Sequence, residues 1–203
     1  MEVKKIAVIG AGAMGNGIAQ VGIMSGFDVA MQDIEQRFVD RGVTTIKDSL
    51  AKFTQKGKVS QEQADEMLRR LTATTDIATA VRDADLVIEA VFEDLDLKKK
   101  VFADLDAHAP KHTILASNTS SMSITDIASA TKRPQQVVGM HFFNPAVLLK
   151  LVEVIYARQS SDDAINTTFE VAKKMGKVPV IVRKDSPGFI YNRVNAPTAL
   201  LLQ

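Results

Sequence analysis

Residues 5–15 read KIAVIGAGAMG, in which a short apolar strand runs directly into a turn with glycine at its first, third and sixth positions. Gly10 would permit the tight turn, Gly12 would let the backbone approach a pyrophosphate, and Gly15 would let the next helix pack close to the strand. The amino end of that helix would offer N–H groups and its positive dipole end to phosphate. We therefore expect cofactor contacts from Gly10, Gly12, Ala13, Met14 and Gly15.

An acidic residue after the second strand supports the same interpretation. A helix is expected over 15–25 and a strand over 29–32, and Asp33 follows that strand, eighteen positions after Gly15. In dinucleotide-binding folds, a carboxylate about 20 residues on accepts hydrogen bonds from ribose hydroxyls. Asp33 would repel a 2′-phosphate, so the sequence favours NAD over NADP, although Arg37 lies nearby. The alternative is that these are ordinary turn glycines and that Asp33 caps a strand end.

The composition is that of an ordinary globular protein. Of 203 residues, 46% are hydrophobic and 24% charged, and the formal net charge of +1 gives no reason to expect a nucleic-acid or membrane partner. The chain has no cysteine, which excludes disulfides and thiolate ligands, and its three histidines are not spaced as metal ligands. Without a signal peptide or an apolar run of about 18 residues, we expect a cytoplasmic protein.

Strand-like and helix-like segments alternate along most of the chain. Strands are expected at 5–9, 29–32, 84–90, 113–116, 137–140, 151–155 and 178–182. Helices are expected at 15–25, 38–56, 61–71, 95–108, 124–130 and 162–175. The second and third helices would form a helical hairpin. This alternation predicts an α/β fold, a doubly wound and mostly parallel sheet of Rossmann type. We expect residues 1–184 to form this domain and residues 185–203 to begin a second, helical one.

Three polar clusters follow expected strands, at 89–93, 117–121 and 141–144. Ligands of open α/β sheets bind at the carboxyl ends of the strands, so these clusters would meet at one edge. A histidine there suits proton transfer from an alcohol, and a carboxylate on its second ring nitrogen would orient it. His141 and Glu153 form such a pair if neighbouring strands bring them together. The alternative for His141 is a hydrogen-bonded structural histidine, but Glu153 in an apolar strand needs a buried partner, which favours the pairing.

Five segments carry a resemblance to a known family. They are IAVIGAGAMGNGIAQ, DLVIEAVFEDLDLKK, ILASNTSSMSIT, GMHFFNPAVLLKLVEVI and DSPGFIYNR. On these segments the chain resembles the 3-hydroxyacyl-CoA dehydrogenase family, including its bacterial 3-hydroxybutyryl-CoA members, over essentially its whole length. The resemblance identifies the chain with the family's N-terminal NAD-binding domain. The motifs SNTSS, HFFNP and LVEV are together far more specific than the glycine turn.

The resemblance implies a catalytic set. His141 matches the family's catalytic histidine and Glu153 matches its partner. Ser120 and Asn144 match polar groups that contact the 3-oxygen of the substrate or the histidine. Asn192 matches an asparagine at the entry to the second domain. We take all five as catalytic candidates, and Ser120 and Asn144 also as substrate-binding ones.

Further matches concern the cofactor and the CoA moiety. The positions that match cofactor-contacting residues of the family are Glu93, Lys98, Ser117 and Asn118. Lys52 and Lys56 lie on the expected helical hairpin, which in the family helps to hold CoA. The alternative for these two lysines is a solvated surface.

The implied reaction is the NAD-dependent oxidation of a 3-hydroxyacyl-CoA to the 3-ketoacyl-CoA, or the reverse reduction of acetoacetyl-CoA, with His141 as general acid and base. It belongs to fatty-acid and butanoate metabolism. Family members usually continue into an all-helical domain that closes the cleft and forms a homodimer, whereas this chain ends as such a domain begins. Two alternatives stay open. One is a non-catalytic NAD-binding module, and the other is a 6-phosphogluconate-type hydroxyacid dehydrogenase, which shares the glycine turn but typically uses a catalytic lysine.

Overall fold

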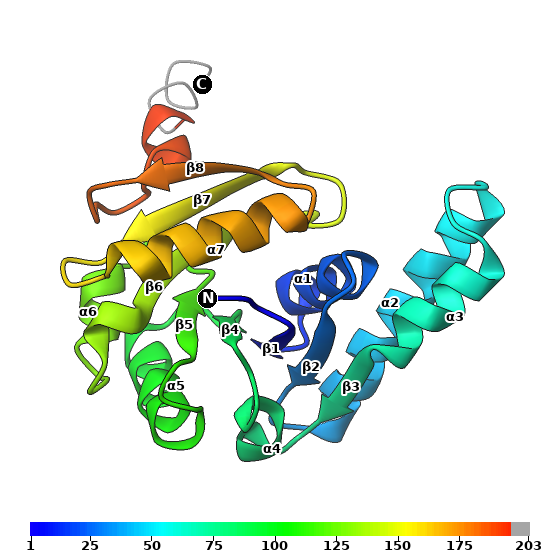
Figure 1. Cartoon of the computed structure of the whole chain (residues 1–203), viewed down its shortest axis with the longest axis horizontal. Coiled ribbons are helices and arrows are strands. Elements are labelled where there is room, and N and C mark those ends of the chain that lie inside the picture. The colour runs from blue at the N-terminus through cyan, green and yellow to red at the C-terminus, as the bar shows by residue number, and fades with distance from the viewer. Residues whose placement is uncertain (196–203) are drawn as a thin grey trace.

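The computed structural model describes residues 1–195, which are built around one eight-stranded sheet (Figure 1). The strand order is β3-β2-β1-β4-β5-β6-β7-β8. The strands are β1 (Lys5–Ile9), β2 (Asp28–Gln32), β3 (Leu71–Thr74), β4 (Leu86–Glu89), β5 (Ile114–Ser117), β6 (Val137–Phe142), β7 (Leu151–Tyr156) and β8 (Val178–Val182). Neighbouring strands are parallel except for β6 and β7, which pair antiparallel. The predicted doubly wound, mostly parallel sheet is confirmed.

Helices cover both faces of this sheet. They are α1 (Ala13–Met24), α2 (Gln36–Gln55), α3 (Gln61–Arg69), α4 (Ile77–Val81), α5 (Leu95–His108), α6 (Ile124–Ala128) and α7 (Asp162–Lys174), with a 3₁₀ turn at Pro134–Gln136. Alternate strand residues point to opposite faces, so Ile6 and Val8 join the core under α1, α2 and α7. Ala7 and Ile9 join the core under α4, α5 and α6. Both faces are buried, as in other parallel sheets.

The predicted helical hairpin is present as α2 and α3, and Figure 1 shows it leaning away from the sheet. Ser60 caps α3, since its hydroxyl accepts from the Gln63 N–H while the Gln63 side chain accepts from the Ser60 N–H. This is the capping box that the sequence indicates. In the part of the chain that the structure describes, no helix has the length and apolar character needed to cross a bilayer.

Two elements were not expected. The strand β3 begins at Leu71, where the sequence predicts the end of a helix, and it lies at the sheet edge beside β2. Its middle residues Thr72 and Ala73 are exposed, so it lacks the apolar pattern of a central strand. The short helix α4 follows, capped by the Asp76 carboxylate, which accepts from the N–H groups of Ala78 and Thr79.

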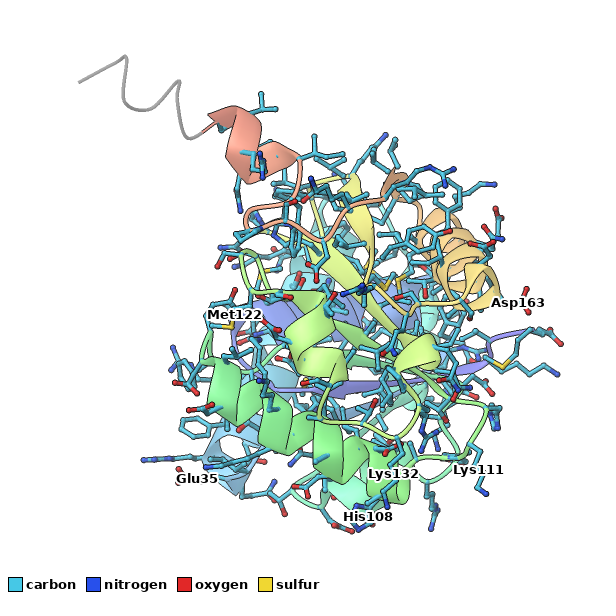
Figure 2. The ribbon with its side chains drawn as sticks, turned by 90° about the vertical axis from the view of Figure 1, so that its left-hand side faces the viewer. Glu35, His108, Lys111, Met122, Lys132 and Asp163 are labelled. Carbon is cyan, nitrogen blue, oxygen red and sulfur yellow. The ribbon has the colours of Figure 1, made fainter. Side chains whose placement is uncertain are left out.

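Two of the three histidines, His108 and His112, are exposed and lie away from the carboxyl ends of the central strands. Figure 2 shows His108 at the outer end of α5. His112 is exposed and its Nε2 lies 3.3 Å from Asp85. No group of three or more His, Asp or Glu side chains within residues 1–195 is arranged to hold a metal ion.

The glycine turn between β1 and α1 is closed by direct backbone contact. Gly10 has φ of +105°, a conformation that side chains disfavour, and a Cβ there would lie 2.6 Å from the Ala90 oxygen. A Cβ on Gly15 would lie 1.8 Å from the Gly10 oxygen. Gly15 is therefore required because the first turn of α1 lies against the Gly10 backbone, directly after β1.

We expect Gly15→Ala to destabilise the domain by about 3 kcal/mol, since the backbone must move to admit the methyl group. For a chain of this size, the melting temperature would fall by about 10 °C. Gly12→Ala is the matched control, because a Cβ on Gly12 meets no atom within 4 Å. Equal melting temperatures for wild type and Gly15→Ala, measured by circular dichroism, would contradict the described contact.

Candidate functional site

A pocket of about 430 Å³ lies where the strands β4, β5 and β6 end beside the amino end of α1. Its lining residues are Met14, Ala90, Val91, Glu93, Asn118, Ser120, His141, Phe142, Phe143, Asn144 and Asn192. The polar clusters that follow the expected strands therefore meet at one edge of the sheet, as predicted.

His141 and Glu153 lie directly opposite each other across the antiparallel strands β6 and β7. The distance from His141 Nδ1 to Glu153 Oε2 is 2.8 Å, and the two residues are 5% and 1% exposed. Strand β6 extends through Phe142, two residues beyond the predicted end, so His141 is held within a strand. With Nδ1 used by the carboxylate, Nε2 is the ring nitrogen that remains for a molecule in the pocket.

The second oxygen of Glu153 binds the start of the last described helical segment. Glu153 Oε1 accepts from the N–H groups of Ile190 and Tyr191, at 2.9 Å each. Burial raises the pKa of Glu153, but the hydrogen bonds from His141 and from these two amides outweigh it and hold the pKa below its usual value. The carboxylate therefore stays ionised and keeps His141 in one orientation.

Aromatic rings confine the imidazole of His141. The ring of Phe143 lies 4.4 Å from it and that of Phe189 lies 5.8 Å from it, measured between centroids. Tyr191 in turn packs edge-on against Phe143 at 4.6 Å. These contacts remove water from the sides of the imidazole, which strengthens its interaction with Glu153.

The amino end of α1 is open to an anion. Gly12 caps this helix without a side-chain hydrogen bond, and the first turn holds no acidic residue. A Cβ on Gly12 would meet no protein atom within 4 Å. The absence of a side chain there leaves room for an anion at the helix terminus, a site that we call the dinucleotide cradle. Asp33 follows β2 beside the glycine turn, where its Oδ2 accepts from the Ala11 N–H at 2.8 Å and its Oδ1 accepts from the Ile34 N–H. Because each carboxylate oxygen can accept a further hydrogen bond, Asp33 fits the ribose hydroxyls of a dinucleotide.

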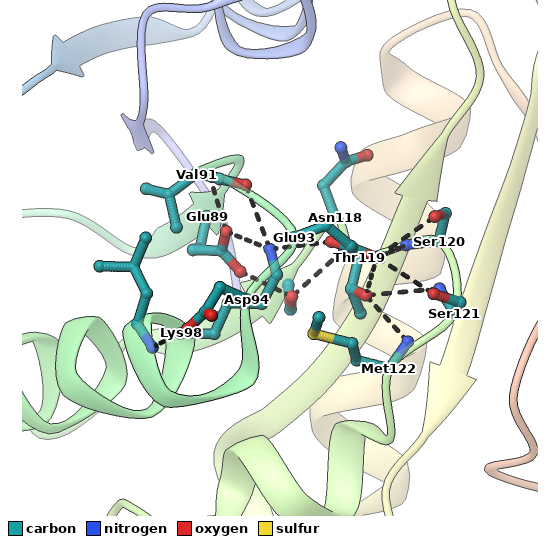
Figure 3. A network of polar contacts seen from close by, with 12 residues as sticks. Glu89, Val91, Glu93, Asp94, Lys98, Asn118, Thr119, Ser120, Ser121 and Met122 are labelled. Atoms are coloured by element: carbon teal, nitrogen blue, oxygen red, sulfur yellow. Dashed lines mark hydrogen bonds and ion pairs between the residues drawn. The ribbon is translucent and has the colours of Figure 1, made fainter.

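Glu93 organises the loop that follows β5 (Figure 3). Its Oε1 accepts from the Thr119 hydroxyl at 2.5 Å and from the Ser120 N–H at 2.8 Å. Burial raises the pKa of Glu93, yet the hydrogen bonds from Thr119 and Ser120 and the Lys98 ammonium together lower it. Glu93 is therefore an ionised residue in the wall of the pocket.

Four of the other expected residues surround the pocket or hold its walls. Ser120 and Asn144 line it, and the Asn192 side chain donates to the Ser120 carbonyl at 3.0 Å. The Asn118 side-chain oxygen accepts from the Phe142 N–H at 2.8 Å, so Asn118 also fixes the end of β6.

The remaining expected residues do not line this pocket. Ser117 and Lys98 are buried behind its wall, where both bind Glu89. Glu89 had no individual role in the sequence analysis, although a carboxylate inside the apolar run ADLVIEA signals a buried partner. Lys52 and Lys56 are exposed on and just beyond α2.

The lowered pKa of Glu153 predicts a pH-dependent contribution to stability. Folding lowers this pKa, so the ionised Glu153 contributes its full stabilisation at neutral pH. That stabilisation is lost as the pH falls through the folded-state pKa, which lies below about 4.5. The difference in unfolding free energy between wild type and Glu153→Gln should therefore be largest near neutral pH and shrink in acid. Urea titrations across this range measure it.

The control for that titration is Glu66→Gln. Glu66 makes only exposed ion pairs with Arg69 and Arg70. Exposed ion pairs contribute little to stability, so the difference in unfolding free energy between wild type and Glu66→Gln should stay small across the whole pH range. A Glu153→Gln difference that is constant with pH would contradict the account of the pair.

A family model and several known proteins match most of this chain. Residues 5–186 match the family model described as 3-hydroxyacyl-CoA dehydrogenase, NAD binding domain. The chain is 46% identical over 193 residues to the 3-hydroxybutyryl-CoA dehydrogenase of Clostridioides difficile, covering 95% of this chain and 68% of that protein. The crystal structure of FadB2 from M. tuberculosis superposes with a TM-score of 0.96 at 38% identity, covering 100% of this chain and 71% of that one.

A second solved structure gives the same result. The (S)-3-hydroxybutyryl-CoA dehydrogenase PaaH1 from Ralstonia eutropha has a TM-score of 0.94 at 39% identity, over 97% of this chain and 69% of that one. The chain thus belongs to the 3-hydroxyacyl-CoA dehydrogenase family, and residues 5–186 are its NAD-binding domain.

Proposed function

We propose that this NAD-dependent dehydrogenase oxidises the 3-hydroxyl group of an acyl-CoA thioester to a ketone, and catalyses the reverse reduction, with His141 as general acid and base. The observation that carries the proposal is the His141–Glu153 pair, 2.8 Å apart, in a pocket that also reaches the amino end of α1. A proton-transfer group and a dinucleotide cradle in one pocket are what alcohol oxidation requires.

The cofactor is NAD, since the matched domain is the NAD-binding domain of the family. In our proposal the backbone at Gly10, Gly12, Ala13, Met14 and Gly15 holds the pyrophosphate and Asp33 the ribose. Glu93 and Asn118 line the pocket, and we assign them to the nicotinamide end of the cofactor. The chemistry that bound NAD⁺ would supply is acceptance of a hydride from the carbon that bears the 3-hydroxyl group.

His141 moves the proton in this proposal. Its Nε2 takes the proton of the 3-hydroxyl group during oxidation and returns it to the ketone oxygen during reduction. Glu153 stabilises the imidazolium that forms and keeps Nε2 directed into the pocket. The surrounding rings of Phe143 and Phe189 exclude water, so the charge of Glu153 acts strongly on the imidazole.

Polar residues around His141 would position the substrate. Ser120 and Asn144 line the same pocket, and Asn192 reaches it from the start of the last described segment. We assign them to the 3-oxygen of the substrate or to the histidine. Lys52 and Lys56, exposed on the helical hairpin, are assigned to the phosphates of CoA.

We also propose that the NAD-binding domain covers residues 1–184 and that a second domain starts at residue 185. Asp185 binds the amino end of α6, since its carboxylate accepts from the Ser123 hydroxyl and from the N–H groups of Ile124 and Thr125. This contact anchors the start of the second segment on the first domain. Residues 196–203 lie outside the described part of the chain.

Two other functions compete with this proposal. A non-catalytic NAD-binding module would bind NADH without turnover. A hydroxyacid dehydrogenase with a catalytic lysine would need a lysine at the pocket, and within residues 1–195 no lysine lines it. Lys98, which lies behind the wall, is held by Glu89 at 2.7 Å. The observations therefore favour histidine as the proton-transfer group.

We expect Gly12→Ala to weaken NADH binding without lowering the melting temperature. The backbone φ of −64° accepts alanine and no protein atom lies near the added methyl group, which would instead occupy the space of the pyrophosphate. Fluorescence titration should show an affinity loss of about tenfold or more. Unchanged NADH affinity would argue against the proposed cradle.

His141→Gln should retain NADH binding but lose about 10²- to 10⁴-fold in kcat for acetoacetyl-CoA reduction, because no group then donates the proton. The oxidation of NADH is followed by absorbance. His112→Gln, at an exposed position, serves as the control and should keep wild-type turnover. Full activity of His141→Gln would refute the assigned role, and NADH binding without turnover in the wild type would favour the non-catalytic module.

A further inference from the structure

A buried lysine between α7 and β8 takes no part in the proposed proton transfer. Lys177 is 9% exposed, and its Nζ donates to the carbonyl groups of Ala146 and Leu149, the second at 3.0 Å. Burial lowers the pKa of Lys177, and no carboxylate among residues 1–195 offsets that effect. A buried ammonium is costly unless its N–H groups are hydrogen-bonded, so the two carbonyl groups indicate what Lys177 does.

The end of α7 fixes the backbone that carries this ammonium. Gly176 has φ of +70°, and its N–H donates to the Lys173 carbonyl at 2.9 Å. The Lys177 N–H donates to the Ala172 carbonyl at 3.0 Å. These two hydrogen bonds form the Schellman motif, which commonly ends a helix at a glycine. The main chain of Lys177 is therefore held in one conformation.

The two carbonyl groups belong to a single helical turn between β6 and β7. The N–H groups of Leu148 and Leu149 both donate to the Pro145 carbonyl, at 3.0 Å each. We call residues 145–149 the β6–β7 turn. An isolated turn leaves most of its carbonyl groups without helical N–H partners, and a cation beside them is favourable. Lys177 supplies both the donors and the positive charge.

The β6–β7 turn also packs against α1. Ala146 is 2% exposed, and a Cβ added to Gly17 of α1 would lie 3.2 Å from the Ala146 Cβ. Ala146 therefore contacts α1 through its methyl group and Lys177 through its carbonyl group. These contacts leave the turn little freedom to move while Lys177 stays in place.

The two residues before the β6–β7 turn line the pocket. They are Phe143 and Asn144, and the ring of Phe143 lies 4.4 Å from the imidazole of His141. Asn144 directly precedes Pro145, whose carbonyl group accepts both N–H groups of the turn. A shift of the turn would therefore move the residue that we assign to the 3-oxygen of the substrate or to the histidine.

We propose that Lys177 is a positioning residue for the substrate side of the pocket, because it fixes the β6–β7 turn and thereby Asn144 and Phe143. Lys177 is not among the residues that line the pocket, so it acts through the turn. The dinucleotide cradle lies at the amino end of α1, outside the turn. The effect on turnover rests on the proposed function, whereas the effect on the position of Asn144 does not.

Lys177→Met keeps a long unbranched side chain but removes the N–H donors, so both carbonyl groups lose their partner. We expect kcat for acetoacetyl-CoA reduction, followed by NADH absorbance, to fall about tenfold because Asn144 is displaced. The Kd for NADH, from fluorescence titration, should stay within about twofold of the wild-type value, because the cradle is unchanged. The side-chain amide signals of Asn144 should shift in nuclear magnetic resonance spectra, and the Leu148 and Leu149 amides should exchange with deuterium faster.

The stability-matched control is Val171→Ala, which removes two methyl groups from the core beside α7 and leaves Lys177 in place. Both variants should melt about 5 °C below the wild type, Lys177→Met through unsatisfied carbonyl groups and Val171→Ala through a cavity. Val171→Ala should nevertheless keep the wild-type kcat, Asn144 signals and exchange rates.

Wild-type kcat together with unchanged Asn144 signals in Lys177→Met would overturn the proposal and make Lys177 purely structural. An equal loss of kcat in Val171→Ala would overturn it as well, because the loss would then follow stability. Absent turnover in the wild type with intact NADH binding would instead refute the proposed function, and the Asn144 signals would still test the positioning role.

Discussion

The pairing of His141 with Glu153 depends on the one change of strand direction in the described sheet. Strand β7 runs antiparallel to β6, and their register sets the two residues opposite each other. The parallel strands β1, β4, β5 and β6 bring their carboxyl ends to a common edge, where the amino end of α1 opens. Strand β7 lies on the side of β6 away from β5 and places an ionised glutamate against Nδ1 of His141, so Nε2 is the ring nitrogen that remains for a molecule in the pocket.

Two buried glutamates fix the pocket by the same physical means. Glu153 binds His141 with one oxygen and the amides of the last described segment with the other. Glu89 binds Lys98 and the Val91 amide with one oxygen and Ser117 with the other. An ionised carboxylate in a region of low dielectric constant needs several donors, and it therefore holds those donors in place. Each glutamate thus stabilises the position of a short segment beside the pocket.

The glycine turn and Asp33 could be predicted from local sequence, because they belong to one strand–helix–strand unit. The pairing of His141 with Glu153 could only be conditional, since strand register depends on the whole sheet. The edge strand at 71–74 was not expected because it has few apolar residues. The contacts of Glu89 with Lys98 and Ser117 were not predicted, although the same argument, a carboxylate in an apolar strand, singles out Glu153. Lys98, the partner of Glu89, lies one helix turn beyond the strand's end loop, where sequence patterns give no contacts.

The central claim is that one pocket holds both the nicotinamide of the cofactor and the proton-transfer group, His141. A crystal structure of the chain with NAD⁺ and acetoacetyl-CoA tests this claim most directly. The account predicts the nicotinamide beside Glu93 and Asn118, and the 3-oxygen of the substrate within hydrogen-bond distance of His141 Nε2, about 2.6–3.2 Å. A nicotinamide bound outside this pocket, or a 3-oxygen bound by another proton donor with His141 turned away, would contradict it.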